Sequence, residues 1–243
     1  MRIPRVHVET ELKAGAEIAL APAHSHYLKH VLRLPAGATL ILFNGTDSFD
    51  YLAELIVDGK KLSARITAIT PVQTESPLNC EIIQGLGRSD HMDWMVQKTT
   101  ELGVTRIRLF NAERTQSPLK TAKLEKKLQH WRSVAISACE QSGRALLPEI
   151  SFHSNLDQAI SACAADQILL LDFKGEPLPS LLNRPAQSIG ILLGPEGGLN
   201  PAEIERAQKS GCKRASLGPR VLRTETAATS TLAIVQALAG DLN

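Results

Sequence analysis

The chain has 243 residues, of which 43% are hydrophobic and 21% charged, and its formal net charge is +2. A chain of this composition can bury a normal core in one or two domains, and its mild basicity permits a nucleic-acid partner without requiring one. The N-terminus lacks the apolar segment of a secretory signal, and no stretch has the length and apolarity of a membrane span, which argues against secretion and membrane insertion. The cysteines are scattered without a C-x-x-C pair, so we expect reduced thiols in a cytoplasmic protein.

The first part of the chain, residues 1–72, is predicted to be rich in strands. Short apolar or alternating runs cover residues 38–43, 49–57 and 61–69, and Asn-Gly and Asp-Gly dipeptides separate them. Such dipeptides tolerate the positive φ of tight hairpin turns. A helical pattern over residues 23–33 precedes the strands. These elements predict a small β-barrel or sandwich.

A polar segment with prolines at both ends, residues 71–78 (PVQTESPL), is the best candidate for a linker. Beyond it, residues 73–243 are predicted to form a second domain in which strands alternate with helices. This pattern is typical of an α/β domain with a mostly parallel sheet. The predicted strands are residues 80–86, 107–110, 167–171 and 189–193, and the predicted helices are residues 90–101, 122–141, 201–209 and 224–239.

The most informative segment is a loop within residues 189–200 (IGILLGPEGGLN). A short apolar strand leads into Gly194-Pro195, which turns the chain, and Gly197-Gly198 lacks the side chains that would keep a ligand away from the backbone. Asn200 and Glu203 stand where a near capping box would begin a helix, whose free N–H groups would face the loop. Taken alone, this loop is explained equally well as an ordinary strand–turn–helix connection.

A second loop within residues 215–226 (ASLGPRVLRTET) repeats this design. Thr224 can cap the helix that follows, and Glu225 lies in its first turn, where the helix dipole favours a carboxylate. Capping does not explain why Arg220 and Arg223 precede the helix. Two such loops, close in sequence and opening successive helices, favour a binding site for a small ligand over two simple turns.

Two further patterns are weaker. Residues 85–90 (GLGRSD) follow a predicted strand and open a helix, but they lack the third glycine and the acidic ribose partner of a dinucleotide-binding fingerprint. His26 and His30 are four residues apart on the predicted helix, with His24 close by, but no acidic or cysteine ligand accompanies them. We therefore expect neither a dinucleotide site nor a metal.

The segments LLGPEGGLNPAEIE and LGPRVLRTETAA resemble those of the SPOUT (α/β-knot) RNA methyltransferases, and are most similar to the family that methylates N3 of a uridine in 16S ribosomal RNA. QKTTELGV, NAERTQ and AISACEQSGR are similar to further segments of that family, and the N-terminal sequence resembles its PUA-like RNA-binding barrel. The resemblance implies a C-terminal α/β domain with a deep trefoil knot, S-adenosylmethionine as cofactor, the small ribosomal subunit as partner, and an obligate homodimer.

The resemblance also implies which residues form the site. Arg223 and Glu225 are candidates for catalysis, because uridine N3 is a weakly acidic imide that needs charge stabilisation and a proton acceptor. Arg223 could equally anchor a phosphate or pair with Glu225. A third cofactor loop is expected after the strand that ends near Leu171 and Asp172. The expected cofactor-binding residues are Leu171, Leu193, Gly194, Pro195, Glu196, Gly197, Gly198, Leu217, Gly218, Leu222, Arg223 and Thr224.

RNA is held largely through its phosphates, which arginine and lysine bind. The expected RNA contacts are Arg2, Arg5, Lys29, His30 and Arg33 in the first domain, and Arg88, Arg114 and Arg144 in the second. The dimer interface or a solvated helix face are the alternatives for Arg114 and Arg144. A helix with Lys120, Lys123, Lys126 and Lys127 is a further basic surface, which could also be merely solvated.

Two other functions fit the same sequence. One is a knot methyltransferase that acts on ribose 2′-hydroxyls or on tRNA, and the identity of the methylated nucleoside separates it from the first. The other is a ribosome-assembly factor that binds RNA without catalysis, for which a Gly194→Val substitution would leave RNA binding and biological activity unchanged.

Overall fold

The computed structural model describes residues 3–59, 61–182 and 187–242. The chain divides into two compact units. The first comprises residues 1–75 together with residues 139–147, and the second comprises residues 76–138 and 148–243. The predicted boundary between residues 72 and 73 therefore stays a prediction, and each unit is described separately.

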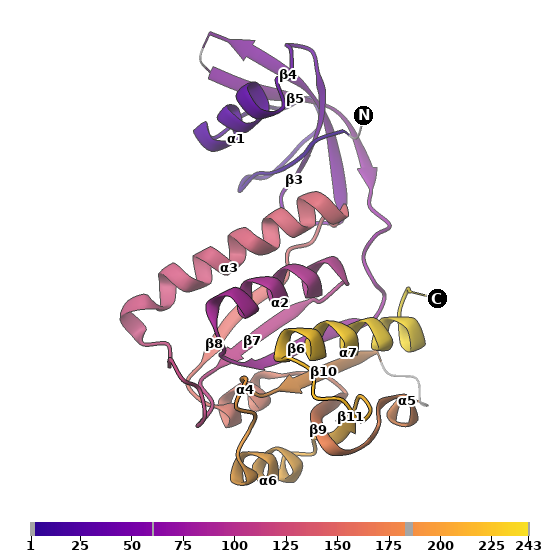
Figure 1. Cartoon of the computed structure of the whole chain (residues 1–243). Helices are drawn as coiled ribbons and strands as arrows, with labels where there is room; N and C mark the ends of the chain where they lie inside the picture. The colour runs from indigo at the N-terminus through magenta and orange to yellow at the C-terminus, as the bar shows by residue number, and fades with distance from the viewer. Residues whose placement is uncertain (1–2, 60, 183–186, 243) are drawn as a thin grey trace. The chain divides into compact units, whose positions relative to one another are not determined.

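The first unit contains a five-stranded sheet with the order β1-β3-β4-β5-β2, and the long hairpin of β4 and β5 is visible in Figure 1. Strand β1 pairs in parallel with β3, whereas the other neighbours are antiparallel. The predicted strand-rich character is confirmed, but the three-residue strands β1 and β2 were not predicted. The bounds are Arg5–His7 for β1, Glu17–Ala19 for β2, Thr39–Phe43 for β3, Phe49–Asp58 for β4 and Lys61–Pro71 for β5.

A short helical segment covers the core of this unit. It begins as α1 (Pro22–His26) and continues as a π-helical turn over Tyr27–Val31. Leu28 is its only fully buried side chain among the described residues of the segment, and it packs with leucines of β3 and β4. The remaining side chains of the turn face outward, which leaves Lys29 and His30 exposed.

The second unit is built on a six-stranded sheet with the order β11-β9-β10-β6-β7-β8. Every neighbouring pair in it is parallel, as predicted. Because the strands are parallel, their carboxyl ends meet at one edge of the sheet, where the two glycine loops begin. The bounds are Asn79–Gly85 for β6, Arg106–Phe110 for β7, Glu149–His153 for β8, Gln167–Pro177 for β9, Ser188–Leu193 for β10 and Lys213–Ser216 for β11.

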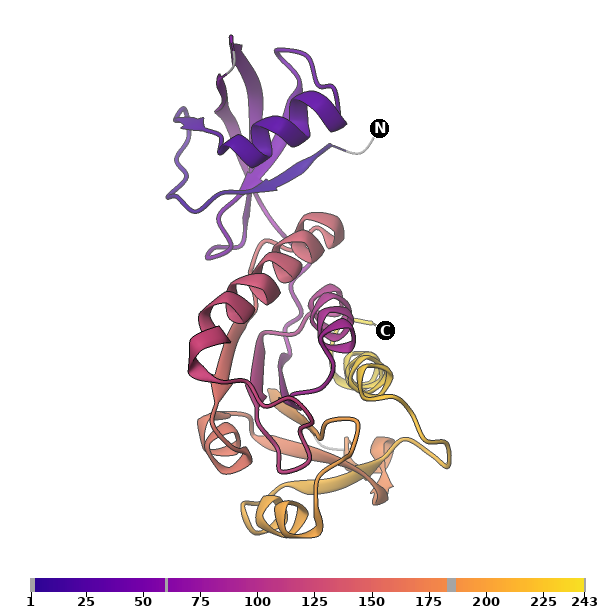
Figure 2. The ribbon, with the colours of Figure 1, turned by 60° about the vertical axis from the view of Figure 1, so that its left-hand side comes forward.

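Helices cover both faces of this sheet (Figures 1 and 2). Ile82 and its neighbour Ile83 point to opposite faces, so one contributes to the core under α2, α3 and α7 and the other to the core under α4 and α6. The bounds are Ser89–Glu101 for α2, Thr121–Ser142 for α3, Leu156–Ala162 for α4, Leu178–Leu181 for α5, Pro201–Lys209 for α6 and Thr224–Ala239 for α7.

The four long helices of this unit and the strands β6, β7, β9 and β10 agree with the sequence prediction, whereas β8, α4, α5 and β11 were not predicted. Strand β11 has the sequence KRAS and buries only Ala215, so it lacks the apolar run by which a buried strand is identified. Strand β9 continues to Pro177, well beyond the predicted end near Leu171. The trefoil knot stays a prediction.

Candidate functional site

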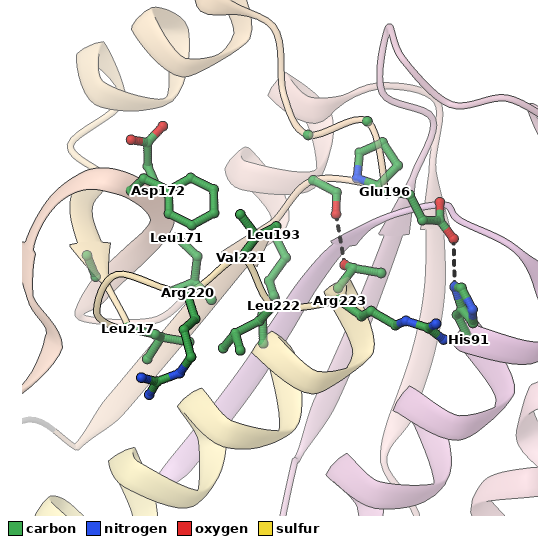
Figure 3. A pocket seen from close by; sticks show the side chains of 18 of the residues that line it. His91, Leu171, Asp172, Leu193, Glu196, Leu217, Arg220, Val221, Leu222 and Arg223 are labelled. Atoms are coloured by element: carbon green, nitrogen blue, oxygen red, sulfur yellow. Dashed lines mark hydrogen bonds and ion pairs between the residues drawn. The ribbon is translucent and has the colours of Figure 1, made fainter.

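A cavity of about 780 Å³ lies at the carboxyl ends of β10 and β11, within the second unit. Both glycine loops line it, together with residues of β9 and the start of α2 (Figure 3). Leucine side chains contribute much of the wall, from Leu171, Leu193, Leu217 and Leu222. The cavity is therefore an apolar cleft with exposed backbone groups, of a size that suits a nucleoside-containing ligand.

The first loop fits against β6 at contact distance. A Cβ atom on Gly85 would lie 2.7 Å from Cδ and 2.9 Å from N of Pro195, so the loop can approach β6 only because Gly85 has no side chain. A Cβ atom on Gly194 would lie 2.7 Å from the backbone N of Leu199, which makes the tight turn dependent on glycine. Both glycines therefore shape the cavity wall.

The predicted capping box starts α6. The side chain of Asn200 accepts a hydrogen bond of 2.8 Å from the backbone N–H of Glu203, and the Glu203 carboxylate accepts one of 2.8 Å from the N–H of Asn200. The other oxygen of Glu203 accepts the N–H of Glu113, 3.0 Å away on the loop after β7. Glu203 thus joins the first glycine loop to a neighbouring loop, a role that its place in a capping box does not reveal.

A polar network joins the second loop to the first. Thr224 Oγ1 donates to the carbonyl oxygen of Gly194 at 3.0 Å, and the amide of the fully buried Gln84 donates to the same carbonyl at 2.9 Å and to Thr224 Oγ1 at 3.0 Å. The expectation that Thr224 caps α7 is wrong, because Arg223 occupies the N-cap without a side-chain hydrogen bond. The Thr224 hydroxyl instead binds the other loop.

Strand β9 supplies the third part of the wall. Its pairing with β11 runs through Leu170 and resumes at Glu176, so the residues between leave the regular ladder. Leu171, Asp172 and Phe173 of this interruption line the cavity. The expected third loop is therefore present as an interruption within the strand rather than after its end.

A cluster of titratable groups lies where the first loop meets α2 (Figure 3). His91 Nδ1 is 2.9 Å from Oε1 of Glu196 and 3.7 Å from Oε2 of Glu225, and the same Glu196 oxygen accepts the N–H of Arg88 at 2.8 Å. Glu225 Oε2 is buried and has no hydrogen-bond partner within the described chain. His91 lines the cavity, whereas Glu225 is buried and is not among the lining residues.

The carboxyl groups at the cavity are held in their charged form. Burial raises the pKa of Glu196, but hydrogen bonds from the Arg88 N–H, its own N–H and His91 outweigh it and bring the pKa below its ordinary value. Burial also raises the pKa of Asp172, but the hydrogen bonds from the Lys174 N–H and the Arg214 guanidinium outweigh it and bring that pKa below its ordinary value. Neither carboxylate is therefore well suited to accept a proton near neutral pH.

Every residue predicted to bind the cofactor lines this cavity. Of the two catalytic candidates, Arg223 lines it and is exposed, whereas Glu225 does not line it. The expected cofactor loops, residues 193–198 and 217–225, include the lining residues Arg220 and Val221, whereas sequence reasoning gave no site role to His91, Gln116 and Phe173, which also line the wall. His91 directly follows residues 85–90, which were set aside as an incomplete dinucleotide motif, so its position after a buried strand was the signal that could have found it.

The residues predicted to contact RNA have different surroundings. Arg5 and Arg144 are buried, and they pair with Asp50 and Glu75 inside the first unit, so the structure does not support them as phosphate ligands. Arg114 donates to the carbonyl of Gly197 at 3.0 Å and so contacts the first glycine loop. Lys29, His30, Arg33 and Arg88 are exposed, and Arg2 lies outside the described residues.

Residues 3–59, 61–182 and 187–242 contain no group of three or more histidine, cysteine, aspartate or glutamate side chains placed to hold a metal ion. In the same residues, no helix combines the length and apolarity that crossing a membrane requires.

The comparison with protein families is decisive. Residues 74–236 match the model of the RNA methyltransferase domain, and residues 22–67 match that of the RNA methyltransferase PUA domain. This chain belongs to the RNA methyltransferase family. The membership expected from the two Leu-Gly-Pro loops is thereby confirmed, as is the PUA-like character of the N-terminal part.

Several relatives and solved structures match this chain over nearly its whole length. The ribosomal RNA small subunit methyltransferase E of Buchnera aphidicola (subspecies Schizaphis graminum) is 30% identical, with 100% of this chain and 99% of the relative covered. A methyltransferase structure from Legionella pneumophila with bound S-adenosylmethionine is 34% identical, with a TM-score of 0.92 and both chains covered completely. The ribosomal RNA small subunit methyltransferase E of Neisseria gonorrhoeae, also bound to S-adenosylmethionine, is 32% identical over the whole of both chains, with a TM-score of 0.91.

Proposed function

We propose that this chain transfers a methyl group from S-adenosylmethionine to N3 of a uridine in the 16S RNA of the small ribosomal subunit. The observation that carries the proposal is the cavity, whose wall consists of both glycine loops joined through Thr224, Gly194 and Gln84. Membership of the RNA methyltransferase family and two similar structures with the cofactor bound support the same reaction.

The residues present fit S-adenosylmethionine. The cavity volume of about 780 Å³ is within the range of small-molecule sites, and its leucines can cover the adenine ring while backbone groups of the glycine loops bind polar edges. Gly197, Gly198 and Gly218 place no side chain in the way. When bound, the cofactor supplies a methyl group on a positively charged sulfur, which needs no metal for its activation.

The chain must still deal with the imide proton of uridine. Arg223 is exposed at the cavity, and its side chain has no hydrogen bond or ion pair among the described residues, so it is available to stabilise negative charge on the base. His91 lines the same cavity, and its Nδ1 faces the carboxylates of Glu196 and Glu225. We assign His91 as the proton acceptor, with Glu196 orienting its ring, as carboxylates orient histidines in other acid–base pairs.

Glu225 remains a second candidate for this step. Its Oε2 is a buried acceptor without a hydrogen-bond partner in the described chain, and it lies 3.7 Å from His91 Nδ1. Because Glu225 does not line the cavity, we expect it to act through His91, by stabilising the imidazolium that forms when His91 takes up the proton.

The proposed partners follow from the substrate. We propose that the protein works in the cytoplasm as a homodimer on the assembled small subunit. The PUA-like unit would contact RNA through its exposed Lys29, His30 and Arg33. The boundary between residues 72 and 73 is proposed as the limit of that RNA-binding domain.

The test uses labelled S-adenosylmethionine and small subunits that lack the modification, followed by digestion to nucleosides and mass spectrometry. Label in 3-methyluridine of small-subunit RNA is the expected result. Label in a 2′-O-methylated nucleoside or in tRNA would assign the protein to a different methylation. Binding of subunits without any transfer would make a non-catalytic assembly factor the better account.

A further inference from the structure

Strand β9 carries an arch, defined here as residues 171–175. Leu169 and Leu170 pair with Lys213 and Arg214 of β11, and the next residue of β11, Ala215, pairs with Glu176. Consecutive residues of β11 therefore face residues of β9 that are six positions apart. The intervening residues have no partners in this ladder and pass along the edge of the cavity, which Leu171, Asp172 and Phe173 line.

The arch is held firmly at both of its sides. Asp172 Oδ1 accepts the N–H of Lys174 at 2.7 Å and pairs with Nη2 of Arg214 at 2.5 Å. At the other side, a Cβ atom on Gly175 would lie 2.6 Å from backbone atoms of Arg214 and Ala215, so the arch crosses β11 at a distance that only glycine allows. These contacts fix the shape of the arch and with it the position of Phe173.

Phe173 is the exposed member of this fixed arch. It is 64% exposed, although it belongs to a strand and lines a cavity whose other apolar residues include the half-buried Leu171 and the buried Leu193. Val221, 83% exposed, belongs to the same cavity and comes from the second glycine loop (Figure 3). Large apolar side chains that a rigid backbone holds in water are typical of binding surfaces.

The charges around Phe173 indicate what it binds. Arg220 and Arg223 are exposed and line the same cavity, and their side chains have no hydrogen bond or ion pair among the described residues. An exposed aromatic ring and unpaired guanidinium groups that line one cavity are a combination by which proteins bind unpaired nucleotides, because the ring stacks on the base while cations contact phosphates. A small ligand enclosed by the leucines would lie deeper in the cavity than Phe173. An RNA chain would have to approach from the side on which Phe173 is exposed to solvent.

We propose that Phe173 is a stacking platform for an unstacked base of the RNA substrate. The proposal rests on the proposed function, and it assigns the arch of β9 to the RNA side of the cavity rather than to the cofactor. Enzymes that modify a base must first take it out of its stack, and an aromatic surface at the entrance offsets part of the stacking that the base loses.

The experiment compares three variants of the full-length protein, Phe173→Ala, Phe173→Trp and Phe173→Leu. Steady-state kinetics with unmodified small subunits give kcat and KM, calorimetry gives the Kd for S-adenosylmethionine, and gel filtration gives the oligomeric state. We expect Phe173→Ala to lower kcat/KM for subunits by about 5- to 150-fold, the range that loss of one base–aromatic stack produces. The Kd for the cofactor should not change.

The other two variants separate stacking from a general apolar contact. Phe173→Trp should retain most of the activity, and its fluorescence should be quenched when unmodified 16S RNA is added, in excess of any quenching in the unsubstituted protein. Phe173→Leu should resemble Phe173→Ala, because leucine has no planar face. Full activity of Phe173→Leu would overturn the proposal.

Two further results would also overturn it. A parallel loss of cofactor affinity in Phe173→Ala would place the ring on the cofactor, and a change of oligomeric state would place it in a subunit interface. If the unsubstituted protein itself transfers no methyl group to subunits, the proposed function fails. Normal transfer by both the unsubstituted protein and Phe173→Ala would contradict the stacking role alone.

Discussion

Thr224 and Gly194 lie 30 residues apart in the sequence, and the Thr224 hydroxyl donates a hydrogen bond of 3.0 Å to the Gly194 carbonyl. Gln84, from a strand more than a hundred residues away in sequence, donates to both of them. Three segments are thereby fixed around one cavity. The wall therefore depends on hydrogen bonds between its own segments, of which only the Gln84 side chain is fully buried, and these bonds can be tested by substitution.

Replacing Thr224 by valine removes this link while keeping the shape of the side chain. We expect cofactor affinity to fall by about five- to tenfold, corresponding to the ~1 kcal/mol that one hydrogen bond contributes. Thr224→Ser, which keeps the hydroxyl, is the matched control and should bind nearly normally. Calorimetric titration with S-adenosylmethionine measures both, and equal affinities of the two variants would contradict the role of the hydroxyl.

Gly85 and Gly197 offer a graded test of the first loop. A methyl group on Gly85 would meet Pro195 at 2.7 Å, whereas one on Gly197 would meet Cβ of Arg114 at 3.3 Å. Gly85→Ala should therefore displace the loop, cost ~1–3 kcal/mol of stability as overpacking does, and weaken cofactor binding strongly. Gly197→Ala should have a much smaller effect. The expected order, read from thermal unfolding and cofactor titration, would be contradicted if Gly197→Ala were the more damaging change.

His91→Gln tests the assigned proton acceptor. Because glutamine cannot take up the imide proton, we expect kcat to fall by about 10²- to 10⁴-fold. The control is Asp90→Asn. Asp90 is exposed, and its Oδ2 lies 3.9 Å from His91 Nε2, beyond hydrogen-bond distance. Single-turnover rates of methyl transfer measure both variants. A His91→Gln enzyme with a normal rate and a Glu225→Gln enzyme without activity would move the assignment to Glu225.

The cysteines are expected to be unreactive in the folded protein. Burial raises the pKa of Cys80 and Cys139 to about 12, and that of Cys163 and Cys212 to about 11. At pH 8 nearly all four thiols are therefore protonated, and only the thiolate reacts with iodoacetamide. Mass spectrometry should show little labelling of the native protein, with Cys163 first, and labelling of all four in guanidinium. Rapid native labelling of Cys80 would contradict this burial.

Arg33 is the one non-glycine residue with positive φ in the described chain, at 53°, and its side chain is exposed. Backbone strain of this kind often accompanies function. Arg33→Gly should relieve the strain and raise stability by ~1 kcal/mol, while it weakens binding to small subunits and lowers the salt dependence of that binding. Thermal unfolding and binding at several salt concentrations measure the two effects. Loss of stability together with unchanged binding to small subunits would refute a role of Arg33 in RNA binding.

Local chemistry explains why part of the site could be predicted. Gly194, Pro195 and Gly218 follow strands and precede helices, and turn and capping preferences act over a few residues. The capping box of Asn200 and Glu203 was correct for the same reason. Thr224 shows where local reasoning stops, because its hydroxyl could satisfy its own helix or a distant carbonyl, and the sequence favours the nearer partner.

Burial and long-range contacts were beyond the reach of the sequence. Arg5 and Arg144 read as basic surface residues, but each is buried beside a carboxylate that lies far away in the chain. Phe173 follows the predicted strand of residues 167–171, and only the structure shows that the arch of β9 holds it exposed to solvent.

The amino-acid sequence by itself determined the parallel α/β character of the second unit, the family, and the two loops that line the cavity, because apolar periodicity, glycine and capping residues act locally. Only the tertiary structure decided that His91 and Phe173 belong to that cavity, and that Glu225 does not line it. These positions depend on how β6, β9 and β10 pair, and strand pairing joins residues whose separation in the chain carries no local signal.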